Sequence, residues 1–220
     1  EIRAAEILRR RLGDIYISVS SEVLPEFREF ERFSTTIINA FVGPKVNRYM
    51  DRLIRRLQDL GIYAPPQTIH SNGGLLPVDT VRSYPVRTCL SGPAAGVVGA
   101  AGLAVAAGVP DVVTFDVGGT STDVSLIADG KPAFTSSRKI ADYAVRSPMI
   151  DVQVIGAGGG SIAWIDAGGA LKVGPMSAGA VPGPVAYGLG GTEPTLTDAN
   201  LVLHRLDAEG TLAGKVRVDE

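Results

Sequence analysis

The chain has 220 residues and a formal net charge of −2, so it offers no broad basic face for nucleic acid, and no nucleic-acid partner is expected. Hydrophobic residues make up 45% and charged residues 20%, which is typical of a globular protein in water. The single cysteine, Cys89, excludes an internal disulfide and a multi-cysteine zinc site, and its count fits a reducing, cytoplasmic setting.

The N-terminal part is predicted to be mainly helical. It begins without methionine and already in a helical pattern, EIRAAEILRR, so we expect an excised piece of a longer protein. Residues 14–20 are predicted to form a strand, and a charged loop with a single helical turn follows. The strongest helix covers residues 44–61, because apolar residues recur at helical spacing, Pro44 suits a first turn and Gly61 an exit. Residues 66–74 (PQTIHSNGG) predict a buried strand that ends at a glycine turn.

No charged residue occurs from Thr88 to Pro110. A membrane span would fit this length, but the run is mostly Ala and Gly, opens with SGP and closes with GVP. We therefore expect no membrane association and predict a buried helix that starts near Ser91. Three glycines recur along it at intervals of three: Gly96, Gly99 and Gly102. They indicate either a helix pressed closely against a sheet or a helix that slides or pivots between lobes.

The stretch VVTFDVGGTSTDVSLI, residues 112–127, predicts a hairpin whose turn is Gly118 to Ser121. In that register Asp116 lies opposite Asp123, an unfavourable pair of like charges unless a cation binds between them or one acid is protonated. Magnesium prefers carboxylates together with water and phosphate oxygens. Glycine turns bring backbone N–H groups close to an anion, and three hydroxyls follow as further donors, at Thr120, Ser121 and Thr122. A phosphate-and-magnesium site is one interpretation, and an ordinary hairpin is the other.

Short strands separated by glycine turns are predicted after the hairpin, then a long irregular loop and a final helix that Thr197 or Asp198 could cap. The mixture of helices and strands favours an α/β fold. The segment GAGGGS, residues 156–161, differs from a dinucleotide-binding fingerprint because it ends in serine and precedes a strand. It is either a structural turn or a turn near a catalytic cleft.

The two histidines and the cysteine are interpreted as structural. His70 and His204 stand outside any metal-binding spacing, and Cys89 next to an apolar run is expected to be a buried, inert thiol. Solvated strand ends are favoured over cleft acids for Asp151 and Asp166.

Taken together, several phrases resemble the A subunit of the hydantoinase/oxoprolinase family, within the superfamily of actin, sugar kinases and heat-shock-chaperone ATPases. They are SSEVLPEFREFERFSTTIINAFV, SNGG, SGPAAGVVGAA, FDVGGTSTDVSL, IGAGGGSIAWID, VGPMSAGAVPGP and TLTDANLVL. The resemblance implies an α/β, actin-like (ribonuclease H-like) ATPase fold. Residues 1–90 would be the distal part of the first lobe, 91–108 the connecting helix, and 109–220 the start of the second lobe.

The resemblance also implies an ATP-dependent hydrolase that opens cyclic amides such as hydantoins or 5-oxoproline, with a B-type hydantoinase subunit or domain as partner in a hetero-oligomer. ATP would phosphorylate the amide oxygen and so activate the carbon for attack by water. Asp116 would hold magnesium, largely through water, and Asp123 would support the ion or polarise a water. Gly118, Gly119 and Thr120 would wrap the terminal phosphates, with Ser121 and Thr122 as neighbouring donors. The turn after the hairpin would approach the substrate through Gly158, Gly159 and Ser161.

Two alternatives stay open: a ketone carboxylase subunit of the acetone carboxylase type, and a non-catalytic nucleotide switch or reactivating subunit. The family has a second GGT hairpin and an adenine-binding turn that this sequence lacks, so the chain alone is expected to be inactive. The sequence also departs from the family pattern in the loop PGPVAYGLGG. Val185-Ala186 replaces an expected Ala-Cys pair, Leu189 an arginine, and, further on, His204 a glycine.

Overall fold

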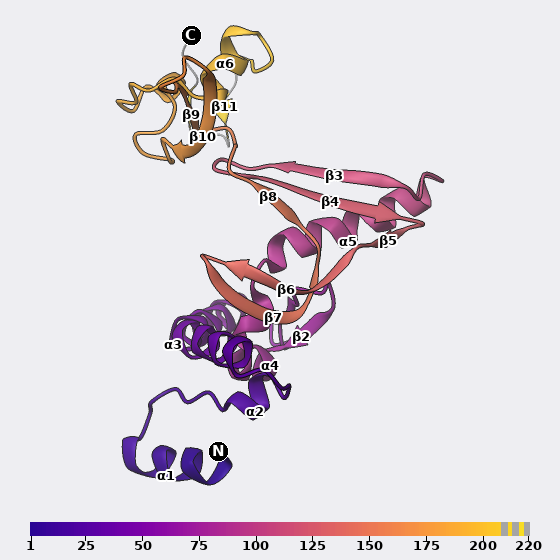
Figure 1. Cartoon of the computed structure of the whole chain (residues 1–220), viewed down its shortest axis with the longest axis vertical. Coiled ribbons are helices and arrows are strands. Elements are labelled where there is room, and N and C mark those ends of the chain that lie inside the picture. The colour runs from indigo at the N-terminus through magenta and orange to yellow at the C-terminus, as the bar shows by residue number, and fades with distance from the viewer. Residues whose placement is uncertain (208–210, 213–215, 218–220) are drawn as a thin grey trace. The chain divides into compact units, whose positions relative to one another are not determined.

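The computed structural model of the chain describes residues 1–207, 211–212 and 216–217. They fall into two units. The first, here the helical unit, comprises Glu1–Val112 and Ile127–Asp151, and the second, the glycine-rich unit, comprises Val113–Leu126 and Val152–Glu220. The chain contains both helices and strands, as the predicted α/β class requires (Figure 1).

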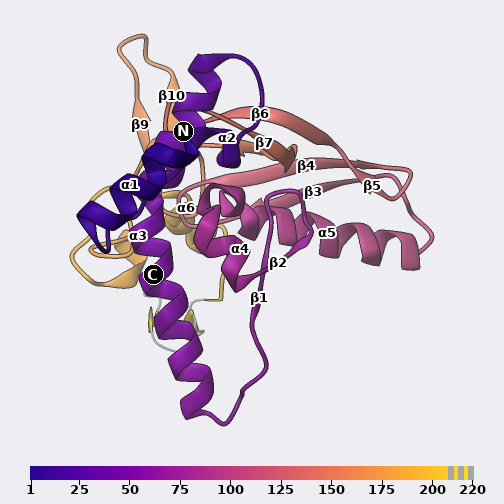
Figure 2. The ribbon, with the colours of Figure 1, turned by 90° about the horizontal axis from the view of Figure 1, so that it is seen from below.

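The helical unit is organised by α3 (Glu29–Asp59), seen as one long helix in Figure 2. The sequence predicted a helix from Pro44, but α3 begins much earlier and contains that proline. Proline normally crowds the Cβ of the residue before it, and here that residue is Gly43, which has none. The same missing Cβ admits the ring of Tyr16, which a side chain at Gly43 would strike.

The predicted strand at residues 14–20 is wrong. After α1 (Ile2–Leu12) the chain is extended without a strand partner, and α2 (Ser20–Val23) follows as a single turn. The alternating pattern arises because Tyr16 and Ser18 both face the fully buried Asn39 of α3. The Asn39 Nδ2 donates to Ser18 Oγ at 2.9 Å, and the Tyr16 hydroxyl donates to the carbonyl of Arg82 at 2.9 Å.

A hairpin of β1 (Gln67–Ile69) and β2 (Leu75–Pro77) confirms the predicted strand and glycine turn, but β1 is exposed to half-buried where a buried strand was predicted. The helices α4 (Val78–Ser83) and η1 (Pro85–Thr88) follow. Met50 of α3 packs with Leu76 and Val81 in one part of the core. The uncharged helix is α5 (Ser91–Ala106), with the predicted start. Close packing of its glycines is not found: a Cβ built on Gly96, Gly99 or Gly102 meets no described atom within 4 Å. No described helix combines the length and the apolarity that crossing a bilayer requires.

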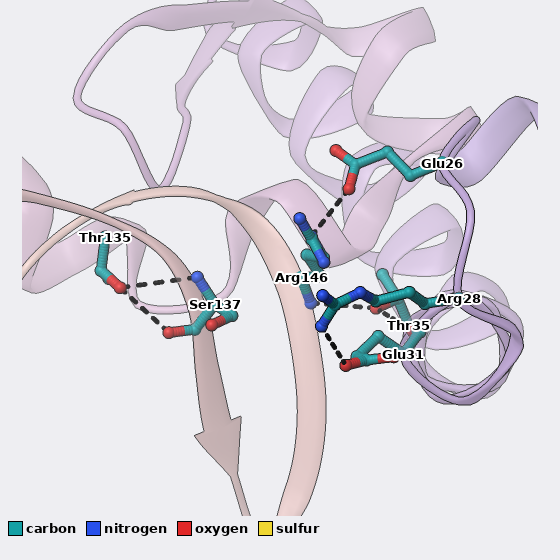
Figure 3. A network of polar contacts seen from close by, with 7 residues as sticks. All are labelled: Glu26, Arg28, Glu31, Thr35, Thr135, Ser137 and Arg146. Carbon is teal, nitrogen blue, oxygen red and sulfur yellow. Dashed lines mark hydrogen bonds and ion pairs between the residues drawn. The ribbon is translucent and has the colours of Figure 1, made fainter.

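A second hairpin was not predicted from the sequence. It is formed by β6 (Phe134–Ile140) and β7 (Tyr143–Ile150) and follows the short β5 (Lys131–Pro132). Val145 of β7 is fully buried against Val23 and Val86. Arg146 links β7 to the N-terminal part of the unit. Its side-chain Nε lies 2.7 Å from Glu26 Oε2, and its backbone N–H donates to the Thr35 hydroxyl of α3 (Figure 3).

The glycine-rich unit starts with β3 (Val112–Val117) and β4 (Thr122–Ala128), which pair with each other. β8 (Gln153–Ile155) pairs antiparallel with β4, placing Val154 beside Asp123. β9 (Ser161–Ile165) and β10 (Leu171–Ser177) form a bulged hairpin, visible in Figure 2. Then come η2 (Val185–Tyr187), α6 (Leu196–Val202), β11 (Thr211–Leu212) and β12 (Val216–Arg217).

Candidate functional site

The predicted hairpin forms with the predicted turn. The Gly118 N–H donates to the carbonyl of Ser121 at 2.8 Å, and the Thr114 hydroxyl bonds the backbone of Ser125 on the facing strand. Both contacts fit the register in which Asp116 of β3 lies opposite Asp123 of β4. Residues directly opposite on an antiparallel pair point to the same face, so the two carboxylates share one face of the sheet.

The hairpin tip contacts the glycine turn at residues 156–161 through hydrogen bonds between backbone atoms. The N–H of Gly159 donates to the Gly118 carbonyl at 2.9 Å, and the N–H of Gly160 donates to the Gly119 carbonyl at 2.6 Å. A Cβ on Gly158 would lie 2.6 Å from the Gly118 oxygen and under 3 Å from the nitrogens of Thr120 and Ser121. Such an approach requires glycine, because any side chain would separate the two turns. The structure therefore brings together two segments that the sequence had assigned to phosphate and to substrate.

Two of the predicted site residues have buried side chains. The Thr122 hydroxyl donates to the carbonyl of Ala157, and the fully buried Ser161 Oγ accepts the N–H of Gly158 at 2.8 Å. Both bonds shape the glycine turn. Contact of Ser161 with a substrate stays a prediction.

Three functional candidates that sequence reasoning missed lie at the start of α6. Thr195 is the N-cap, in place of the predicted Thr197 or Asp198, and it forms a capping box with Asp198 at the third helical position. The hydroxyl and the N–H of Thr197 both donate to the Gly159 carbonyl at 2.8 Å. Asp198 also accepts the N–H of Ala186 at 2.8 Å. The signal in the sequence was the spacing of Thr195 and Asp198, which is that of a capping box.

A pocket of about 270 Å³ opens beside the hairpin tip. This volume is close to the lower end of small-molecule sites, about 300 Å³. Its walls come from four segments of the glycine-rich unit: Gly119 and Thr120; Gly159 and Gly160; Gly179, Ala180, Pro184 and Tyr187; and Thr197. The tip of the predicted phosphate hairpin thus forms part of the wall of a small-molecule-sized cavity.

Asp116 and Asp123 are the candidate metal ligands of the site predicted from the sequence. Within the described residues, no cluster of three or more His, Cys, Asp or Glu side chains could hold a metal ion by itself. Two carboxylates beside a glycine turn nevertheless fit magnesium, which typically binds one or two carboxylates together with water and substrate phosphates. This pair of carboxylates therefore suits a metal ion that binds together with a nucleotide.

His70 and Cys89 belong to the helical unit. His70 Nδ1 accepts the N–H of Asn72 at 2.9 Å, and burial, with a smaller effect from the charge of Arg87, lowers the pKa of His70. Burial raises the pKa of the Cys89 thiol, which makes it a poor nucleophile. Both properties agree with the structural roles inferred from the sequence.

Comparisons with known proteins extend this description. The family model described as hydantoinase/oxoprolinase matches residues 32–220. The caprolactamase subunit alpha of Pseudomonas jessenii is 44% identical over 221 residues, covering all of this chain and 32% of the relative. The 5-oxoprolinase of Saccharomyces cerevisiae is 36% identical over 92% of this chain and 15% of its own length. The chain thus spans a third or less of these relatives.

Solved structures agree with the sequence comparisons. The crystal structure of an ATP-dependent caprolactamase from Pseudomonas jessenii superposes with a TM-score of 0.80 at 41% identity, covering all of this chain and 32% of that one. A nucleotide-free acetone carboxylase also gives 0.80, at 27% identity, over 98% of this chain and 30% of that one. The predicted actin-like ATPase fold class is confirmed by these neighbours. With a matching family model over most of its length, the chain belongs to the hydantoinase/oxoprolinase family.

Proposed function

We propose that the chain is part of an ATP-dependent hydrolase that opens the ring of a cyclic amide. The observation that carries the proposal is the junction of the two glycine turns, where the Gly159 N–H bonds the Gly118 carbonyl beside a pocket of about 270 Å³. A hairpin suited to phosphate and a cavity suited to a small molecule meet at this junction. Relatives named caprolactamase and 5-oxoprolinase support an amide as the small molecule.

The backbone of Gly118, Gly119 and Thr120 would hold the terminal phosphates of ATP, with the hydroxyls near the tip as additional donors. Asp116 and Asp123 would hold magnesium, which neutralises phosphate charge when it is bound. The amide oxygen attacks the terminal phosphorus, ADP leaves, and the phosphorylated amide carbon becomes open to attack by water. The C–N bond then breaks to leave an acyl phosphate on the opened chain, and a second water hydrolyses it to the free acid and phosphate, so that two waters are consumed in the net hydrolysis of one C–N bond and one ATP.

A second candidate function is ATP-dependent carboxylation of a ketone. The acetone carboxylase neighbour favours it, because its fold agrees with this chain as closely as that of the caprolactamase does. Phosphoryl activation of an oxygen would be shared by both reactions. A carboxylase would require bicarbonate for ATP turnover, whereas an amide hydrolase would not.

The test is phosphate release from MgATP by the full-length protein, together with a B-type partner subunit if the protein has one. Cyclic amides are added singly, with and without bicarbonate. Stimulation by an amide without bicarbonate, lost in Asp116→Asn, supports the hydrolase. Asp129→Asn is the matched control, because Asp129 belongs to the helical unit and its positive φ of 54° is one that asparagine tolerates. Stimulation by ketones only with bicarbonate would replace the hydrolase by the carboxylase.

A further inference from the structure

We infer that the pocket beside the hairpin tip binds the ring of an uncharged cyclic amide and discriminates against a ring that carries a carboxylate. The inference rests on the proposed function and specifies its substrate class. It follows from three features of the pocket wall: the free acceptor capacity of Thr197, the fixed ring of Tyr187, and the chemistry of the side chains that line the cavity.

Thr197 supplies an acceptor for an amide N–H. A hydroxyl has one donor and two acceptor lone pairs, and the donor of Thr197 is directed to the Gly159 carbonyl at 2.8 Å. Thr197 is among the residues that line the pocket, so its hydroxyl oxygen is available to accept a hydrogen bond from a ligand there. A cyclic amide offers both a carbonyl oxygen for phosphorylation and an adjacent N–H for this acceptor. A ketone offers only the oxygen.

Tyr187 forms a fixed apolar wall. A Cβ on Gly183 would lie 2.8 Å from Cδ2 of Tyr187, so the ring rests directly on the glycine backbone. The segment that carries the tyrosine is held by Asp198, which accepts the N–H of Ala186 at 2.8 Å. With Pro184 and Ala180, the aromatic ring gives a surface suited to the methylene groups of a small ring.

The side chains that line the pocket are all uncharged, among the described residues: threonine, tyrosine, proline and alanine, with glycines between them. A carboxylate on the substrate ring would lose hydration there without gaining a cationic partner. Burial of an unpaired charge is among the most unfavourable changes a binding site can impose. A neutral ring of the same size carries no such penalty.

The experiment compares three rings of equal size in the full-length protein with its partner subunit: 2-pyrrolidinone, 5-oxoproline and the neutral carboxamide of 5-oxoproline. Amide-dependent phosphate release gives kcat/KM for each. We expect both neutral rings to exceed 5-oxoproline by at least about tenfold. Equal or better turnover of 5-oxoproline would overturn the inference while leaving the proposed hydrolase intact. Stimulation by none of the three rings would instead count against both.

A charge-introducing variant tests the pocket itself. Ala180 lines the pocket and is exposed, so Ala180→Arg is expected to raise kcat/KM for 5-oxoproline relative to 2-pyrrolidinone by about tenfold or more. Val181→Arg is the matched control, because Val181 is adjacent, 81% exposed and outside the pocket wall, and it should leave the ratio unchanged. The same shift in both variants, or in neither, would overturn the assignment of this pocket to the substrate ring.

Discussion

Asp198 and Ala186 are joined by a hydrogen bond of 2.8 Å, from the backbone N–H of Ala186 to Oδ1 of Asp198. The other carboxylate oxygen, Oδ2, accepts the N–H and the hydroxyl of Thr195 at 2.7 and 2.8 Å. A single side chain therefore starts helix α6 and also fixes the segment that carries Tyr187. These are two walls of the same pocket.

Removal of this carboxylate should loosen both walls. Asp198→Ala eliminates the reciprocal cap and leaves the Ala186 N–H without its acceptor, which together cost about 1–3 kcal/mol of unfolding free energy. Asp198→Asn keeps one acceptor oxygen and should lose less. Unfolding of the full-length protein in urea, with KM for the amide measured alongside, checks the order. Equal stability of wild type and Asp198→Ala would contradict the role assigned to this side chain.

The close approach of the two glycine turns predicts that Gly158→Ala abolishes most amide-dependent ATP turnover. The new Cβ would press on three backbone atoms of the hairpin at 2.6 to 2.8 Å and move its tip. Gly168→Ala is the control in the same unit, since a Cβ there meets only the end of the Asp166 side chain at 3.3 Å. Comparable kcat in the two variants would show that the junction is unimportant for turnover.

The open glycine face of α5 predicts that alanine stabilises this helix. Gly99→Ala meets no described atom within 4 Å, and alanine is favoured over glycine inside a helix by about 0.8–1 kcal/mol. A higher unfolding midpoint of the full-length protein with unchanged ATP turnover is the expected result. A lower midpoint would revive the close packing that the sequence suggested, and unchanged stability with lost turnover would instead favour a helix that slides or pivots.

A pH dependence follows from His70, a residue that is 9% exposed and whose neutral imidazole accepts a backbone N–H. Its pKa in the folded chain lies below the usual 6.5, so the unfolded chain takes up a proton at a higher pH than the folded one. The contribution of neutral His70 to the free energy of unfolding is therefore fully present above pH 6.5. It is lost as the pH falls through 6.5 toward the pKa of His70 in the folded chain.

His70→Asn should flatten this part of the stability profile, because its amide oxygen can accept the Asn72 N–H without titrating. His204→Asn is the matched control, since His204 is exposed and its positive φ of 51° suits asparagine. Urea unfolding at closely spaced pH values between 5 and 8 compares the three proteins. A wild-type profile parallel to that of His70→Asn would rule out the contribution.

The sequence was most informative where local chemistry decides the structure. The turn at Gly118 to Ser121, the start of α5 at Ser91 and the glycine exit of α3 each depend on a few adjacent residues. The strand predicted at residues 14–20 failed because its alternation serves a buried side chain of α3, Asn39, and not a sheet. Periodicity reports which side is buried but not what lies against it.

The pocket could not be predicted from the sequence, for a related reason. Its wall joins Gly119, Gly160 and Thr197, which are far apart in the chain and whose segments meet largely through backbone hydrogen bonds. Backbone atoms are the same for every residue type, so their pairing leaves little trace in the sequence beyond the glycines that permit it. At His204 a backbone requirement does leave a trace in the family pattern. The φ of this residue is 51°, a conformation that favours glycine, and glycine is the residue that the family pattern led us to expect there.

The stacked glycine turns also have a consequence for hydrogen exchange. The amide hydrogens of Gly159, Gly160, Ala178 and Thr197 all bond to backbone carbonyls of the two turns, although most of this region lacks regular secondary structure. Exchange of these amides requires the turns, the end of β10 and the start of α6 to separate. The most glycine-rich part of the chain should thus retain deuterium label as one cooperative group, with the protection usually seen in a helix or sheet.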